Sequence, residues 1–219
     1  MTHPLPSPSR RFFFAATAAA VTLPLLSGCF GLALTGATVG VLAVTDRRSL
    51  GVQTDDETIE LKASARLSKD IKDKSHVNFT SYNRRVLLTG EVPDDATKTR
   101  VAEETRRVEN VEAVWNELSV SGVSSLASRS NDTYVTAKMK GRFVDANTFS
   151  AHHVKVVTEA GIAYLLGIVN QREADAAIHV ARTTQGVRKV VSVMQIGTDA
   201  EIRRIDASIA NSADSTSGK

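Results

Sequence analysis

Residues 154–169 read VKVVTEAGIAYLLGIV, and residues 77–92 read VNFTSYNRRVLLTGEV. Each stretch holds two apolar runs, partly alternating with polar residues, around a short break at residues 160–161 or 83–84. Alternation with a period of two is typical of strands, and a two-residue break between them predicts a β-hairpin. The two hairpins lie 77 residues apart, which is the first sign that the chain contains a repeat.

The repeat continues beyond the hairpins. Residues 110–114 read NVEAV and match GVRKV at residues 186–190, now at an offset of 76, so one single-residue gap separates the copies. Matches in several segments at a nearly constant offset argue for two copies of one module.

The order of elements predicted in each copy is α-β-β-α-β. In the first copy a capping box at residues 54–57 predicts a helix start, followed by strands at 76–82 and 85–92, a helix from Asp94 to about Val108 and a strand at 112–120. The second copy repeats this order, with a helix at 132–144, a hairpin at 153–169, a helix at 172–184 and a strand at 187–196. This is the α+β class, with two helices on one face of a small sheet. A module of about 65 residues has a marginal core, so we expect the copies to pack together, with Trp115 serving that contact.

The first helix of the second copy carries two apolar stripes when its residues are placed about 100° apart. One stripe holds Val135, Met139 and Phe143, and the other holds Tyr134, Ala137, Gly141 and Val144. If the first stripe faces the core, the second faces outward, beside Lys138 and Lys140. An apolar edge bordered by lysines suits the surface of an anionic bilayer. The alternative is one broad core stripe with ordinary solvated lysines.

The start of the chain predicts an export signal. Arg10 and Arg11 precede an uncharged run, and residues 26–29 read LSGC. A basic end, an apolar segment and small residues before a cleavage point are typical of such signals. Residues 26–29 resemble the lipobox of bacterial lipoproteins, which implies cleavage before Cys29 and acylation of Cys29. An ordinary secretory signal and a membrane helix are the alternatives, and the arginine pair also resembles a twin-arginine signal, so the export route stays open.

The predicted organisation has five parts. They are a signal peptide at 1–28, a lipidated glycine-rich tether and linker at 29–53, a first domain at 54–122, a second domain at 130–197 and a polar, disordered tail at 198–219. The uncharged residues 30–45 are too few to cross a bilayer, which takes about 20 residues.

The two domains differ in charge. Residues 55–122 contain 11 Lys and Arg against 14 Asp and Glu, whereas residues 129–196 contain 9 against 5. The second domain is therefore the better candidate for an anionic surface. Export from the cytoplasm makes nucleic acid an unsuitable partner.

The sequence lacks the motifs typical of catalytic and cofactor-binding sites. It has no nucleophile elbow, phosphate-binding glycine loop or paired cysteines. His152 and His153 are adjacent and would point to opposite faces of a strand, which makes a poor metal site. The sequence predicts no metal, no cofactor and no enzyme activity; turnover of phospholipid or peptidoglycan would be the sign of an enzyme.

The element order, together with Gly90 and Gly167 in the second strands and the Gly-Val at 186–187, resembles the BON domain. Two such copies behind a lipobox resemble the dual-BON outer-membrane lipoproteins. The residue after the cysteine, Phe30, is not the aspartate that signals inner-membrane retention. The resemblance implies that the second domain binds anionic phospholipid, chiefly phosphatidylglycerol, through its first helix. It also implies that the protein gathers at division sites and supports outer-membrane integrity.

The family's membrane-inserting tryptophan and leucine correspond to Tyr134 and Val144 here. The expected lipid-binding residues are Tyr134, Lys138, Met139, Lys140 and Val144. Among them, Met139 lies on the side of the helix that faces the core when residues are placed about 100° apart. The alternative function is a scaffold that docks an envelope protein, such as the outer-membrane barrel-assembly machinery.

Overall fold

The computed structural model describes residues 46–217, with side chains to residue 211. The predicted signal peptide, Cys29 and most of the predicted tether lie outside these residues. No helix among the described residues is both long and apolar enough to cross a membrane.

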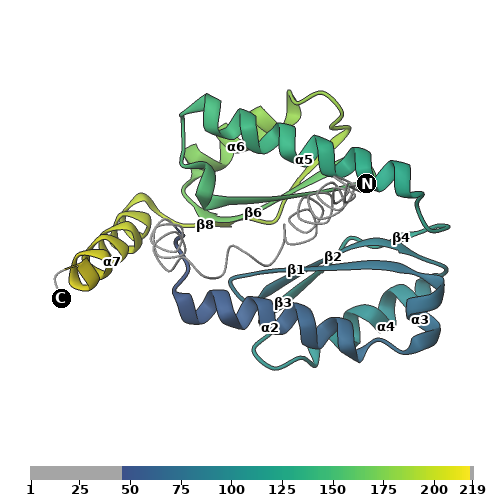
Figure 1. Cartoon of the computed structure of the whole chain (residues 1–219). Helices are drawn as coiled ribbons and strands as arrows, with labels where there is room; N and C mark the ends of the chain where they lie inside the picture. Colours follow the sequence, from purple (N-terminus) through teal and green to yellow (C-terminus); the bar gives the residue numbers. More distant parts are fainter. Residues whose placement is uncertain (1–45, 218–219) are drawn as a thin grey trace, which may run out of the picture. The chain divides into compact units, whose positions relative to one another are not determined.

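The first module spans residues 50–120. Its elements in chain order are helices α2 (Leu50–Arg66) and α3 (Lys69–Lys74), strands β1 (His76–Tyr82) and β2 (Arg85–Val92), helix α4 (Asp95–Arg106) and strands β3 (Ala113–Asn116) and β4 (Ser119–Val120). β1 pairs antiparallel with β2, and β3 and β4 both pair parallel with β2. Helices α2 and α4 lie over one face of this sheet (Figure 1).

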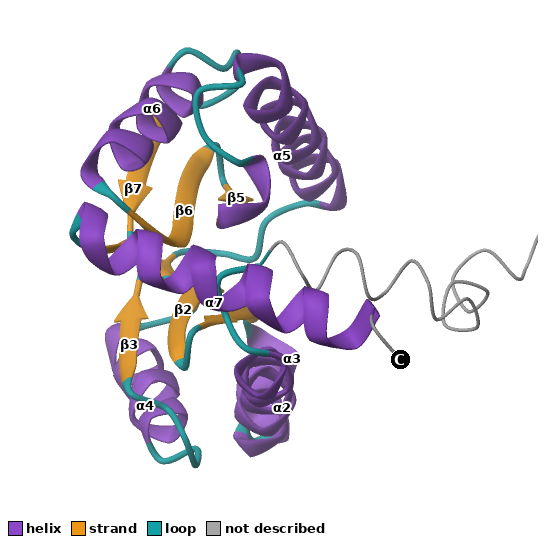
Figure 2. Ribbon diagram, turned by 90° about the vertical axis from the view of Figure 1, so that its left-hand side faces the viewer, coloured by secondary structure: helices purple, strands orange, loops and turns teal. Residues whose placement is uncertain are grey.

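The second module spans residues 126–196 and repeats the pattern. Its elements are helix α5 (Leu126–Ala146), the 3-10 turn η2 (Ala151–His153), strands β5 (Val154–Glu159) and β6 (Ile162–Val169), helix α6 (Gln171–Arg182) and strands β7 (Lys189–Ser192) and β8 (Gln195–Ile196). The pairing again places β6 between β5 and β7, with β8 also on β6. Helices α5 and α6 lie over one face of the sheet (Figure 2). The predicted α+β class and the two copies are confirmed.

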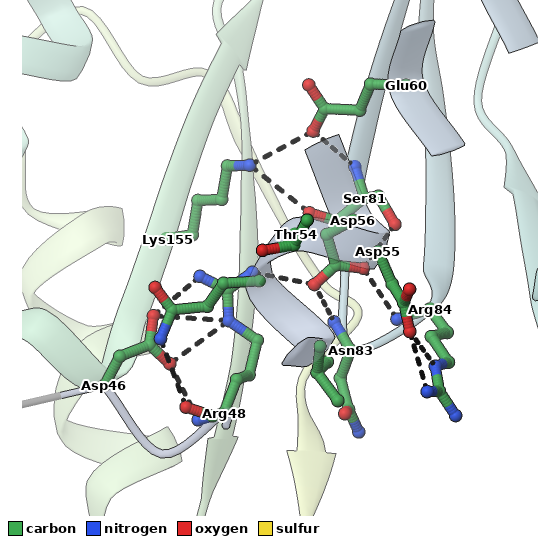
Figure 3. Close-up of polar contacts among 12 residues, drawn as sticks. Asp46, Arg48, Thr54, Asp55, Asp56, Glu60, Ser81, Asn83, Arg84 and Lys155 are labelled. Atoms are coloured by element: carbon green, nitrogen blue, oxygen red, sulfur yellow. Dashed lines mark hydrogen bonds and ion pairs between the residues drawn. The ribbon is translucent and has the colours of Figure 1, made fainter. Parts of the chain in front are cut away.

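Both hairpin turns are held by a carboxylate from the first helix of their own module. Asp56 in α2 accepts from the backbone N–H of Asn83 at 2.8 Å and of Arg84 at 2.7 Å (Figure 3). Asp132 in α5 accepts in the same way from the N–H groups of residues 160 and 161, at 2.9 and 2.8 Å. All four turn residues have positive φ. In this conformation their N–H groups do not take part in the hydrogen bonds between the two strands, and the buried carboxylates accept from them instead.

Glycine is required where the second strand of each module passes the first. A Cβ on Gly90 or Gly167 would collide with the backbone oxygen of His76 or His153, respectively. At the turn after the second helix, the second module has Gly186 at φ +101° and the first has Asn110 at φ +67°. Asparagine tolerates this left-handed conformation better than most residues with a Cβ.

Three apolar clusters hold the described residues together. Each module has its own core between helices and sheet. The third cluster joins the two sheets, with Tyr82 and Leu87 from the first module and Tyr164, Leu166 and Val193 from the second. Trp115 packs against this cluster, which confirms its predicted role between the copies.

Several elements differ from those predicted. Helix α2 begins at Leu50, capped by Ser49, rather than at residue 54, so the linker predicted to end at residue 53 is shorter. The single third strand is split, because Leu118 turns into the core between β3 and β4. His152 and His153 lie in the η2 turn rather than on a strand. The predicted disordered tail forms helix α7 (Asp199–Ser217).

Candidate functional site

Helix α5 is longer at its start than the sequence pattern indicated. Ser125 is the N-cap, and its hydroxyl accepts from the N–H of Ser128 at 3.2 Å. The helix ends at a left-handed Asn147, with φ 47°. The additional first turns carry Leu126, which extends the face that bears the predicted lipid-binding residues.

The inner face of α5 belongs to the core of the second module. Val135, Met139 and Phe143 are each at most 2% exposed, and the Phe143 ring packs edge-on against Phe149 with 5.0 Å between ring centroids. Met139 is fully buried and therefore cannot contact a ligand at the surface. Its place among the predicted lipid-binding residues is wrong, because at helical spacing it falls between Val135 and Phe143 on the core side.

The opposite face of α5 is apolar and exposed. Leu126, Tyr134 and Val144 are 75%, 62% and 66% exposed. They lie on one side of the helix at its periodicity, together with Gly141, where an added Cβ would meet nothing within 4 Å. We call Leu126, Tyr134 and Val144, with Lys138 and Lys140 beside them, the α5 outer face.

The two lysines of this face are placed differently. The Lys138 ammonium lies 4.8 Å from the Tyr134 ring centroid and 3.5 Å from the carbonyl oxygen of Gln185. Lys140 is exposed, and no ion pair holds it among the described residues. An exposed cation–π contact is worth about 0.5–1 kcal/mol, so Lys138 can leave the ring for a stronger anionic partner at little cost.

The helix that carries this face is fixed to its module near both ends. Asp132 ties its N-terminal half to the β5–β6 turn. Arg142 donates to the carbonyl oxygen of Val180 at 3.1 Å and to the hydroxyls of Thr184 and Thr183 at 2.7 and 3.0 Å. Arg142 thereby anchors α5 on α6, whereas Lys140 is exposed to solvent. The outer face is consequently displayed on a rigid support.

A second charged cluster lies where the tether enters the described part of the chain. The Arg47 guanidinium donates two hydrogen bonds to Glu173 of α6, at 2.7 and 3.0 Å, and two to Asp206 of α7, at 2.8 and 3.0 Å. It also donates to the carbonyl oxygen of Ile168 at 2.9 Å. We call Arg47, Glu173 and Asp206 the arginine clasp.

The electrostatics of the clasp follow from its burial. Burial disfavours a charged guanidinium, but the hydrogen bonds that Arg47 donates to Asp206 and Glu173 outweigh it and raise the pKa of Arg47. Burial also acts against the charge of Glu173, yet the Arg47 hydrogen bond leaves the pKa of Glu173 below its usual value. Burial and the Arg47 charge lower the pKa of the nearby His153, whose Nδ1 lies 3.8 Å from Glu173.

The neighbouring Arg48 makes contacts in the first module. Its guanidinium lies 4.1 Å from the Tyr82 ring centroid, 2.6 Å from Asp46 and 2.8 Å from Asp56. Two consecutive arginines therefore hold the entering chain to both modules. The sequence pattern predicts only a linker at these positions. Among the described residues no group of His, Cys, Asp and Glu is arranged to hold a metal ion.

A model of the BON domain matches residues 55–122 and 131–198. The chain belongs to the BON-domain family. The α5 outer face is thus carried by the first helix of the second BON domain.

Individual relatives cover most of the chain. It is 41% identical over 173 residues to outer membrane lipoprotein DolP of Haemophilus influenzae, spanning 78% of this chain and 89% of that one. It is 34% identical to the 21 kDa hemolysin of Actinobacillus pleuropneumoniae, over 68% of this chain and 78% of the relative. Osmotically-inducible protein Y of Escherichia coli is 27% identical, over 71% and 80% of the two chains.

Proposed function

We propose that this protein is an outer-membrane lipoprotein, anchored by acylated Cys29 on the periplasmic side, whose second BON domain binds anionic phospholipid. The observation that carries the proposal is the α5 outer face, where exposed apolar side chains stand opposite the core face of the same helix. A helix that packs on a sheet needs one apolar face, and the second therefore has a separate purpose. The role that follows is to support the integrity of the outer membrane, including at division sites.

The chemistry of the face favours an anionic headgroup such as phosphatidylglycerol. Tyr134 and Leu126 can enter the boundary between headgroups and acyl chains while Lys138 and Lys140 remain at the phosphates. Each cation near an anionic surface contributes about 1 kcal/mol. The two lysines together therefore favour anionic over neutral vesicles by about thirtyfold.

The anchor and the face have separate tasks. Burying one aromatic or aliphatic side chain contributes roughly 1.5–3 kcal/mol, so the domain alone binds weakly and reversibly. Similarity to a relative named as an outer membrane lipoprotein supports an acyl anchor at Cys29, which would supply long residence. The face would then recognise lipid charge at a membrane where the protein already resides.

The test is sedimentation of residues 46–217 with vesicles, a fragment that keeps the arginine clasp and α7 intact. Phosphatidylglycerol-rich vesicles are compared with phosphatidylcholine vesicles, for the wild type and for Tyr134→Glu. The matched control is Leu61→Glu, which places the same charge at another exposed apolar position, 74% exposed, on α2. We expect binding to the anionic vesicles alone, a loss of at least tenfold in Tyr134→Glu and no change in Leu61→Glu.

Two results would contradict the proposal. Equal binding to both vesicle types would remove the role of lipid charge, and unchanged binding of Tyr134→Glu would remove the role of α5. Failure to bind either vesicle would leave the acyl chains as the membrane contact and would favour docking of an envelope protein instead.

A further inference from the structure

The first strand of the first module is an edge strand, because β1 pairs with β2 alone among the described residues. Tyr82 and Arg85 flank the two-residue turn and therefore form a hydrogen-bonded pair. Such pairs alternate along an antiparallel ladder, so the N–H and C=O groups of Val77, Phe79 and Ser81 point away from β2.

Contacts at Ser81 confirm this alternation. Its N–H donates to Oε1 of Glu60 at 2.8 Å, and its C=O accepts from Nζ of Lys155 at 3.3 Å (Figure 3). One end of the exposed edge is thus capped by side chains. The corresponding groups of Val77 and Phe79 have no such partner within residues 46–217, and unpaired edge groups are a template for another strand.

A shallow groove of about 450 Å³ runs along this open part of the edge. Its floor and walls are formed by Leu61 and Ser64 of α2 and by Val77 and Phe79 of β1. Leu61 is 74% exposed, although it projects beside the half-buried Phe79. The groove therefore offers apolar contacts to alternate side chains of an added strand.

The rim of the groove is acidic. Glu57 and Glu60 line it. Glu60 forms an ion pair with Lys155 at 3.3 Å, whereas the Glu57 side chain is exposed and without an ion pair among the described residues. The surrounding domain is acidic as well, with 14 Asp and Glu against 11 Lys and Arg in residues 55–122. An anionic lipid would be repelled here, whereas a basic segment would be attracted.

We propose that this groove binds an extended, basic and apolar peptide segment of a protein partner, which adds a strand to β1. Main-chain hydrogen bonds to Val77 and Phe79 would supply the pairing, Leu61 would contact an apolar side chain, and Glu57 would contact a Lys or Arg. A helical ligand would leave the edge groups unpaired. This site is separate from the α5 outer face, and the two proposals stand or fall independently.

Three labelled peptides test the proposal against the full acylated protein in phosphatidylcholine nanodiscs, by fluorescence anisotropy. The first is KVTVKVTVK, the second replaces each Lys with Glu, and the third keeps the Lys but carries N-methyl groups on alternate amides, so that it cannot pair with a strand. We expect the first to bind and the other two to bind at least about tenfold more weakly. Equal affinities for all three, or binding of none, would overturn the proposal.

Surface variants locate the binding. Glu57→Lys is expected to weaken the basic peptide by about tenfold and to strengthen the acidic one, a reversal that a loss of folding cannot produce. Leu61→Ser should weaken both peptides without changing the preference between them. Tyr134→Glu, the variant that disrupts the α5 outer face, should bind the basic peptide as the wild type does. An unchanged charge preference in Glu57→Lys would place the peptide elsewhere and overturn the assignment.

Discussion

Replacement of Arg47 by alanine tests whether the arginine clasp holds the entering chain and α7 to the second BON domain. The variant removes five hydrogen bonds from a side chain that is 2% exposed, and it leaves Glu173, 9% exposed, without its cation. Removing one partner of a buried ion pair costs about 3–5 kcal/mol. Asp206 is 43% exposed and solvent screens it, so we expect the lower end, about 3 kcal/mol.

The assay combines global and local stability. For a chain of this size, a loss of about 3 kcal/mol lowers Tm by roughly 6–12 °C, which calorimetry of residues 46–217 resolves. Hydrogen exchange should show the local effect. Helix α7 contacts the module through buried Ile202 and through Asp206, so its amides should exchange much faster in Arg47→Ala, while those of β6 exchange at the rate set by global unfolding.

Two further variants separate charge from geometry. Arg47→Lys keeps the charge but lacks the planar fork that holds both carboxylates, and an intermediate loss is expected. Arg66→Ala removes an arginine that is 44% exposed and 3.7 Å from Glu104, and should cost less than about 1 kcal/mol. An Arg47→Ala variant as stable as Arg66→Ala, with α7 still protected, would refute the clasp.

The remaining predictions concern the fold and its pH dependence. Gly141→Ala, on the open side of α5, should raise the free energy of unfolding by about 1 kcal/mol. Gly90→Ala should lower it by on the order of 2–3 kcal/mol, because Gly90 has a positive φ and an added Cβ would meet the His76 carbonyl oxygen. Urea unfolding measures both changes. Asp132→Asn should destabilise by about 1–3 kcal/mol, since the amide can accept from only one of the two turn N–H groups, and amide exchange at the turn should report the loss. The pKa of His153 is lowered by burial and by the adjacent Arg47 guanidinium. As the pH falls, the unfolded chain therefore binds a proton at His153 before the folded chain does. The free energy of unfolding then falls as the pH drops through the ordinary histidine range near 6.5. Urea unfolding at pH 7 and pH 5 should show a smaller fall for His153→Gln, and an equal fall in both proteins would contradict the assignment.

The hairpins could be predicted from the sequence because their determinants are local. Strands β1 and β2 have the bounds that alternation and the turn at 83–84 indicate. The Thr-x-x-Glu signature for helix starts gave mixed results. At Thr198 and Glu201 it caps α7, with bonds of 2.7 Å from the Thr198 N–H and 3.3 Å from the Glu201 N–H, yet the polar composition beyond it predicted disorder.

The same signature at residues 54–57 lies inside α2 and caps nothing. There the Thr54 hydroxyl donates to the carbonyl oxygen of Leu50 at 3.1 Å, and Asp56 is used by the hairpin turn. These outcomes depend on partners far along the chain. The bond between Arg47 and Asp206, which helps to order α7, spans 159 residues, and no local pattern contains it.

The candidate surface was predictable in part, because the periodicity of a helix is a local pattern. Helical periodicity placed Tyr134 and Val144 outside and Val135 inside, because both stripes lie within one regular helix. Leu126 lies before residue 132, where the sequence pattern predicts the helix to start, so the pattern does not include it. Ser125, an N-cap residue directly before that leucine, was the available signal.

The contact between the two sheets has the form of a symmetric dimer interface within one chain. Leu87 and Tyr164 occupy equivalent places in the two copies, as do Trp115 and Val191, and all four belong to the shared cluster or pack against it. An isologous dimer of single modules would use one patch twice in this way. Joining the copies makes the association intramolecular, so it does not weaken on dilution. The chain can therefore keep a paired architecture at any concentration, and the helical faces of its two modules are free to acquire different ligands.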